Sequence, residues 1–258
     1  MGIKKFRIIN FRKLKPVLSL KNIVKSYGNR PVLKGLSFDV FPAQIRGLLG
    51  PNGSGKTTIF QIIMGIISPN KGEVRINNEL VNKLPIHLRA VNHGIGYVPQ
   101  IGGYLVNLSV RQNIEAFCEL HFKDTRERNE RVETIISEFN LDSISSLKAT
   151  NISGGEKRRL SIGIAMISKP RLILLDEPFS ALDPQTISMI KDLILSLQKF
   201  NIACIVSDHQ AASILEISDS TLILGDGIII ADDTPIRLLE KDSKARAIYF
   251  GKHFSSPF

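Results

Sequence analysis

The residues best suited to chemistry form a glycine-rich segment that ends in a lysine and a threonine. The segment that fits the pattern G-x-x-x-x-G-K-[ST] is Gly50-Pro51-Asn52-Gly53-Ser54-Gly55-Lys56-Thr57. Backbone N–H groups of such a loop point at phosphate oxygens, and the positive end of the following helix adds attraction. Lys56 supplies a cation worth roughly 4 kcal/mol before desolvation. A chance turn of this form is expected in on the order of one percent of chains this long.

Two adjacent carboxylates end an apolar run further along the chain. The run Leu172–Leu175 reads as a buried strand, and Asp176 and Glu177 follow at its C-terminal end, where α/β sheets bind ligands. Asp176 is suited to holding Mg²⁺, directly or through water, and Glu177 to orienting an attacking water. Taken alone, such a run is more often a strand that leaves the core. The phosphate loop upstream favours the catalytic interpretation.

A capping pattern precedes this strand. Ser153 and Glu156 in Asn151-Ile152-Ser153-Gly154-Gly155-Glu156-Lys157-Arg158-Arg159 form an S-x-x-E box, which predicts a helix start. The helix N–H groups and the Ser153 hydroxyl could face an anion. A plain helix cap is the better interpretation if this segment is considered by itself.

Four single residues complete the candidate set, each with an ordinary alternative explanation. They are Tyr27 at a turn, Gln100 after Gly96-Tyr97-Val98-Pro99, Asp183 after Ser180-Ala181-Leu182, and His209 after Ser207-Asp208. A lone histidine after a strand is more often structural, and an aromatic residue at a turn more often packs locally. Only their order relative to the motifs above makes them candidates.

The elements that must position these residues alternate between strand-like and helical runs, which predicts a largely parallel α/β core. Strands are expected at Val17–Val24, Leu36–Phe41, Gln44–Leu49, Arg171–Leu175 and Ile202–Val206, with a strand pair around Gly225-Asp226-Gly227. Helices are expected at Lys56–Ile66 and from Asp183, as N-cap, with Pro184 at the first position. The charged helical pattern from about Leu108 to Leu147 predicts an inserted helical lobe.

Composition narrows the class of protein. At 43% hydrophobic residues the chain can bury its own core, and its short apolar runs predict no membrane span. The net charge of +10 admits nucleic-acid binding, an anionic membrane surface or scattered lysines, and scatter is favoured because only Lys4 to Lys15 is dense. Residues 1–16 are expected to be a basic leader, either a membrane-surface element or disordered, and a poor signal peptide. A cytoplasmic location follows.

The two cysteines, Cys118 and Cys204, lie far apart without metal-ligand spacing. Both are expected to be small buried residues.

Taken in order, these motifs resemble those of the ATP-binding-cassette (ABC) ATPases. The segment around Ser153 is the specific part, because other P-loop families lack it; it carries Ile152 where many members have Leu and Glu156 where many have Gln. The resemblance covers about Val17 to Phe254. It implies an α/β P-loop NTPase core with an antiparallel β subdomain and an inserted α-helical subdomain. The implied ABC ATPase domain is 17–254, with the helical subdomain at about 104–168 and a C-terminal segment at about 232–258.

The resemblance also implies a role for each candidate residue. Glu177, His209 and Lys56 would be catalytic, while Thr57, Gln100 and Asp176 would serve Mg²⁺. Asp183 would contact a second copy of the chain in a homodimer that sandwiches two ATP molecules. The implied ATP-binding residues are Tyr27, Gly50, Pro51, Asn52, Gly53, Ser54, Gly55, Lys56, Thr57, Thr58, Gln100, Ser153, Gly154, Gly155 and Glu156.

Flanking segments resemble the lipopolysaccharide-export branch of the family. They are Leu84–Ala90, Leu175–Phe179 and Ile248–Phe254, whereas Ala181-Leu182 and the basic leader depart from that branch. The nearest competitor is a branched-chain amino-acid importer ATPase. The export resemblance implies two integral membrane permease subunits, of the LptF/LptG type, whose coupling helices enter a groove that includes Gln100–Asn113. The ATPase would then be peripheral on the cytoplasmic face of the inner membrane.

Two interpretations from other classes stay open. A soluble ABC protein that acts on ribosomes or DNA would usually carry two cassettes or a long coiled-coil insertion, and this chain has neither, so no nucleic acid is expected. A non-hydrolytic regulator would not need Lys56, Asp176, Glu177 and His209 together. The sequence does not identify the transported substrate, because such an ATPase contacts only the nucleotide and the coupling helices.

Overall fold

The fold is built on two β-sheets in a computed structural model that describes residues 14–240 and 246–250. The strands are β1 (Leu18–Tyr27), β2 (Arg30–Val40), β3 (Ile45–Leu49), β4 (Lys71–Ile76), β5 (Glu79–Leu80), β6 (Ile95–Val98), β7 (Leu172–Asp176), β8 (Ala203–Ser207), β9 (Ser220–Gly225) and β10 (Ile228–Asp233). One sheet is antiparallel, in the order β2-β1-β4-β5. The other has the order β10-β9-β3-β8-β7-β6 and is parallel except for β10. The predicted P-loop core with an antiparallel β subdomain is confirmed.

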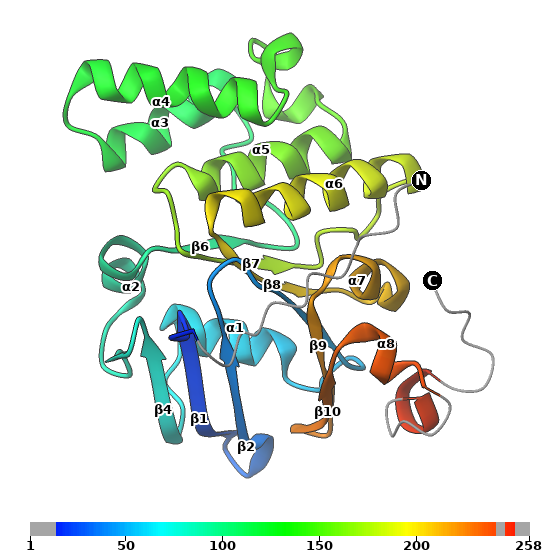
Figure 1. The fold of residues 1–258 in the computed structure, drawn as a ribbon. Coiled ribbons are helices and arrows are strands. Elements are labelled where there is room, and N and C mark those ends of the chain that lie inside the picture. The colour runs from blue at the N-terminus through cyan, green and yellow to red at the C-terminus, as the bar shows by residue number, and fades with distance from the viewer. Residues whose placement is uncertain (1–13, 241–245, 251–258) are drawn as a thin grey trace.

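Helices cover both faces of the larger sheet. They are α1 (Lys56–Met64), α2 (Ile86–His93), α3 (Val110–His121), α4 (Thr125–Glu138), α5 (Gly154–Met166), α6 (Pro184–Leu197), α7 (Ala211–Ile217) and α8 (Pro235–Leu238). In Figure 1, α5 and α6 lie on one side of β6, β7 and β8, and α1 lies on the other side, toward the antiparallel sheet. The helices α3 and α4 form an outer lobe beyond α5.

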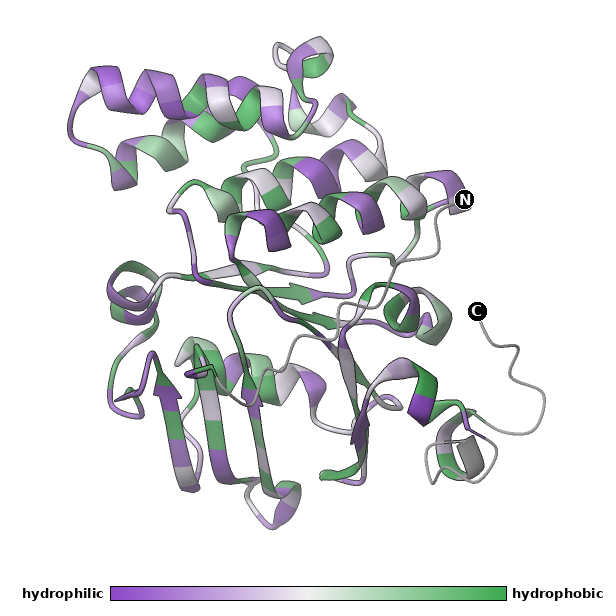
Figure 2. Cartoon of the chain, viewed as in Figure 1, coloured by the Kyte–Doolittle hydropathy of each residue, from purple (hydrophilic) through white to green (hydrophobic). Residues whose placement is uncertain are grey.

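The central strands are buried on both faces. All five residues of β7 are buried, and alternate side chains enter different cores. Ile173 and Leu175 join the core under α5 and α6, whereas Leu172 and Leu174 join the core that includes α1 and the antiparallel sheet. Figure 2 shows the hydrophobic colour concentrated on these strands, while the hydrophilic colour dominates the outer helix α4. This double burial explains why β7 reads as a continuous apolar run.

The inserted helical lobe is present where the charged pattern predicted it. Ser109 caps α3 in a capping box with Gln112, and Asp124 caps α4. Both cysteines are buried as expected, Cys118 in α3 and Cys204 in β8. Burial raises the pKa of the Cys118 thiol to about 11. Both thiols are therefore packing residues.

Some element boundaries differ from the sequence prediction. Strand β2 begins at Arg30, six residues before the predicted start at Leu36, and includes Pro31. A proline is tolerated here because β2 is the edge strand of its sheet. Helix α1 ends at Met64 because Gly65 adopts a left-handed conformation with φ 80°.

Parts of two predicted segments lie outside the described residues. They are nearly all of the basic leader and, in the C-terminal segment, residues 241–245 and 251–258. No helix within the described ranges is long and apolar enough to span a membrane.

Candidate functional site

The glycine-rich loop joins the buried strand β3 to the start of α1. Gly53 and Gly55 have positive φ angles of 78° and 108°, which only glycine adopts readily. A Cβ at Gly55 would lie 2.5 Å from the Leu33 side chain, so the close packing of the loop also requires glycine there. No side chain caps the N-terminus of α1. The first backbone N–H groups of α1 are thus available to an anion.

Lys56 places a buried cation at this loop. Its side chain is 7% exposed, and its Nζ donates to the carbonyl oxygens of Gly50 at 2.6 Å and Pro51 at 3.1 Å. Burial lowers the pKa of Lys56, and the nearby charges of Glu177, Asp176 and Asp208 oppose that shift. The lysine therefore lies in the electrostatic field of the carboxylates at the ends of β7 and β8.

A surface depression of about 260 Å³ opens beside Lys56. Its lining contains predicted site residues from the loop and α1, together with Glu177. The lining residues are Arg30, Val32, Asn52, Gly53, Gly55, Lys56, Thr57, Thr58 and Glu177. Arg30 and Val32 were not predicted as site residues; their contribution depends on how β2 packs over the loop, which no local pattern reveals.

Asp176 is the last residue of β7, and both of its carboxylate oxygens accept hydrogen bonds. Oδ1 accepts from the Ser207 hydroxyl at 2.7 Å, and Oδ2 accepts from the Tyr97 hydroxyl at 3.4 Å. Burial, and then the charge of Asp176, raise the pKa of Tyr97 to about 12. Tyr97 thus remains a neutral donor at ordinary pH, and Asp176 is held in one orientation.

Two predicted residues, Gln100 and His209, contact the carboxylate of a third, Glu177. The Gln100 amide Nε2 donates to Oε2 at 2.5 Å, and His209 Nε2 lies 2.5 Å from Oε1. The backbone of Glu177 has a φ of 48°, which is uncommon for a residue other than glycine, and its N–H donates to the Ser207 carbonyl at 2.7 Å. Strained backbone of this kind is often found at functional sites.

A further set of predicted residues lies at the start of α5. Ser153 caps α5 in the predicted capping box: its hydroxyl accepts from the Glu156 N–H at 3.3 Å, and Glu156 Oε2 accepts from the Ser153 N–H at 2.7 Å. The bond from the Ser153 backbone lowers the pKa of Glu156. None of Ser153, Gly154, Gly155 and Glu156 lines the depression beside Lys56.

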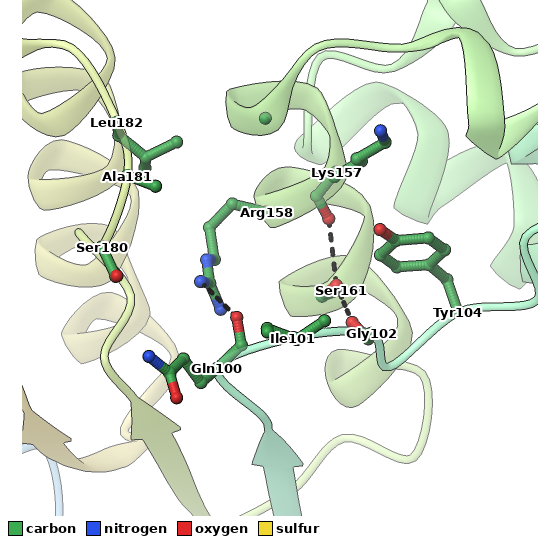
Figure 3. Close-up of a pocket in the computed structure, with 11 residues that line it drawn as sticks. Gln100, Ile101, Gly102, Tyr104, Lys157, Arg158, Ser161, Ser180, Ala181 and Leu182 are labelled. Atoms are coloured by element: carbon green, nitrogen blue, oxygen red, sulfur yellow. Dashed lines mark hydrogen bonds between the residues drawn. The ribbon is translucent and has the colours of Figure 1, made fainter.

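A second pocket, of about 170 Å³, separates α5 from the segments after β6 and β7. Figure 3 shows Arg158 of α5 reaching across to Gln100. Its guanidinium donates to the carbonyl oxygens of Pro99, Gln100 and Glu177 at 2.8, 2.9 and 3.2 Å. Arg158 was missed as a site residue, because an arginine after a capping box has no distinguishing local signal.

Tyr27 and Asp183 also contact none of Gln100, Glu177 and His209 through a described hydrogen bond or ion pair. Tyr27 is 48% exposed, does not line the depression, and has the Lys25 ammonium 5.4 Å from its ring centre. Asp183 is the N-cap of α6 and accepts from the N–H groups of Gln185 and Thr186 at 3.1 and 3.0 Å. Hydrogen bonds from Thr186, the side chain first, lower the pKa of Asp183. Any contact with the nucleotide or a partner through these residues stays a prediction.

Comparison with known proteins identifies the family. The family model described as "ABC transporter" matches residues 33–180. The chain belongs to the ABC transporter family. Among its relatives, the lipopolysaccharide export system ATP-binding protein LptB of Haemophilus influenzae is 37% identical over 92% of this chain and 98% of its own. The LptB of Escherichia coli K12 is 34% identical, with the same coverage.

Solved structures agree on the fold. An ATP-binding cassette of an ABC transporter in its ADP conformation matches with a TM-score of 0.80, at 27% identity over 92% of this chain and 100% of that one. A nucleotide-free cassette from an ABC transporter matches with a TM-score of 0.82 at 24% identity, which shows the fold alone. The ABC protein described here is thus an ATP-binding subunit of a transporter and an ATPase.

Proposed function

We propose that this ABC protein hydrolyses Mg-ATP as a homodimer to drive lipopolysaccharide export. The observation that carries the catalytic part is the meeting of Gln100 and His209 on Glu177, beside the Lys56 loop. The export part is supported by two relatives, both named as ATP-binding proteins of a lipopolysaccharide export system, that match 92% of the chain. The subunit would sit on the cytoplasmic face of the inner membrane.

ATP would bind through the loop 50–58, with its β- and γ-phosphates on the backbone N–H groups and on Lys56. The arrangement supports this role, because α1 begins with free donors and Lys56 is buried beside them. Tyr27 would stack on the adenine. This stacking is compatible with the exposed Tyr27 ring.

The residues present suit Mg²⁺. The Thr57 hydroxyl, the Asp176 carboxylate and the Gln100 amide oxygen are all hard oxygen donors, as this ion prefers. Asp176 already has its orientation set by Ser207 and Tyr97, as second-sphere partners do for metal ligands. When bound, Mg²⁺ would neutralise charge on the phosphate oxygens.

Hydrolysis would depend on Glu177 as the group that orients and polarises the attacking water. His209 would hold Glu177 and bond the γ-phosphate. Gln100 would sense Mg²⁺ and the attacking water and link the site to the transmembrane partner. Ser153, Gly154, Gly155 and Glu156 would contact the ATP held by a second copy, because none of them lines the depression beside Lys56 in their own chain. Asp183 would lie at the same dimer interface.

The permease subunits, of the LptF/LptG type, would dock coupling helices beside Gln100. The segment that follows Gln100 supports this, since it presents large apolar side chains to solvent. Exposed fractions are 86% for Ile101, 47% for Leu105 and 52% for Val106. Such an exposed apolar patch is typical of an interaction surface.

Glu177→Gln tests the catalytic part of the proposal. The substitution keeps the shape of the side chain but removes its basicity, so turnover should fall by about 10²- to 10⁴-fold. Binding of ATP should be unchanged, because the loop and Lys56 are intact. Steady-state phosphate release and equilibrium binding of ATP would separate the two effects; unchanged turnover would refute the role of Glu177.

Purification from membranes tests the transport part. Two polytopic subunits that co-purify with lipopolysaccharide bound would support export. Two polytopic subunits with a periplasmic amino-acid receptor would instead support the importer, and nucleic acid without membrane partners would defeat both.

A further inference from the structure

We propose that Asp208 is a positioning residue that fixes the Glu177 and His209 side chains relative to each other. This inference rests on the proposed catalytic roles of those two residues. Asp208 follows β8 and is only 1% exposed. Its Oδ2 accepts from the Phe179 N–H and its Oδ1 from the Gln210 N–H, each at 2.9 Å.

Each anchored N–H group comes shortly after one member of the catalytic pair. Phe179 comes two residues after Glu177, and Gln210 comes directly after His209. The Gln210 side chain adds a second link, since its Nε2 donates to the Phe179 carbonyl at 3.3 Å. Asp208 thus joins the loops that leave the neighbouring parallel strands β7 and β8. Glu177 Oε1 and His209 Nε2, on these same two loops, lie 2.5 Å apart.

The charge of Asp208 has partners that make its burial tolerable. A buried carboxylate is costly unless it is paired and hydrogen-bonded. Burial lowers the pKa of Arg158, and Asp208 is the foremost of the charges that oppose this shift. Since Arg158 donates to the Gln100 and Glu177 carbonyls, the carboxylate of Asp208 also stabilises the arginine that fixes the backbone around Glu177.

A purely structural role for Asp208 predicts a loss of stability alone, whereas a positioning role predicts a loss of turnover in the folded protein. Asp208→Asn keeps one acceptor oxygen but turns an amide N–H₂ toward a backbone N–H group, which displaces one loop. A misplacement of about 1 Å can lower the rate by about 10²-fold. We therefore expect turnover to fall by about 10- to 100-fold. The Kd for ADP should change much less than turnover, because the hydrogen bonds of Asp208 go to Phe179 and Gln210 and not to the Lys56 loop.

Asp219→Asn is the matched control. The Asp219 Oδ2 likewise accepts from a backbone N–H, that of Ile45 at 2.8 Å, and from Gln198 Nε2 at 2.9 Å. Ile45 begins β3, so this bond lies at the opposite end of the strand from the glycine-rich loop. Asp219→Asn should lower the Tm without lowering the turnover of the folded protein. Equal loss of turnover in both variants would overturn the proposal.

A double-mutant cycle decides whether Asp208 acts through the pair. In a His209→Ala background, Asp208→Asn should cost much less than in the wild type, because the geometry it protects is already lost. A full additional loss would contradict the inference. If Asp208→Asn does not fold, Asp208→Glu, which keeps the charge but lengthens the side chain, should give the same split between turnover and ADP binding. Unaffected turnover in Glu177→Gln would instead defeat the proposed function itself.

Discussion

At the residue scale, the buried ammonium group of Lys56 should dominate nucleotide affinity. Lys56→Met removes a cation whose attraction to a phosphate is roughly 4 kcal/mol before desolvation. The affinity for ATP should fall by about 10²- to 10³-fold, measured by equilibrium binding of a fluorescent ATP analogue. Lys34→Met is the control, because Lys34 forms an exposed ion pair with Asp226 and such pairs contribute little. Equal affinities for wild type and Lys56→Met would contradict the assignment.

The site residues that could be predicted are those in motifs with fixed spacing. Lys56, Asp176 and Glu177 follow runs that identify them within a few positions. The residues that were missed act through contacts between distant segments. Asp208 bonds a backbone group 29 residues away, Ser207 a side chain 31 away and Arg158 a carbonyl 59 away. Only the pairing of β6, β7 and β8 brings these segments together, so no local pattern could mark them.

At the element scale, two helices share the same cap but differ in expected role. Ser109 caps α3 and Ser153 caps α5, each in a capping box. Either serine-to-alanine change should cost about 0.5–2 kcal/mol of stability. Only Ser153→Ala should also lower ATP turnover, because the α5 terminus is proposed to face the γ-phosphate of a second copy. Thermal unfolding and phosphate release measured on both variants would check this.

The comparison of these two variants separates a cap from a functional contact. Equal turnover in Ser153→Ala and Ser109→Ala, with matching losses of stability, would mean that Ser153 is a cap and nothing more.

The elements that could be predicted carry their own periodic signal. The strands β7 and β8 are apolar up to their last residue, β3 is buried throughout although it contains Arg46, and Asp183 with Pro184 marks the start of α6. Strand β6 was not predicted because it is only four residues long and contains Gly96. A Cβ at Gly96 would lie 2.8 Å from the Ile173 side chain, so the neighbouring strand requires glycine against local strand propensity. Such tertiary requirements cannot be read from a single segment.

At the scale of the whole molecule, the glycine-rich loop and the start of α5 line different depressions. The depression beside Lys56 contains no residue of the α5 start, whereas Gly154 lines the other pocket together with Leu182. Ser153 therefore lines no depression together with the glycine-rich loop of its own chain. A second copy in the opposite orientation could bring Ser153 to a glycine-rich loop twice, with the isologous contact that twofold dimers use.

The association state of the hydrolysis-blocked protein follows from this separation. Glu177→Gln should form a dimer in saturating Mg-ATP and remain monomeric in Mg-ADP, because only the γ-phosphate would join the two surfaces. Light scattering after size exclusion would measure this. Ser153→Arg in the Glu177→Gln background should weaken the dimer by steric conflict at α5, whereas Ser109→Arg, at the equivalent cap of α3, should leave it intact. A monomer in saturating Mg-ATP would show that the terminal phosphate is not shared between two chains.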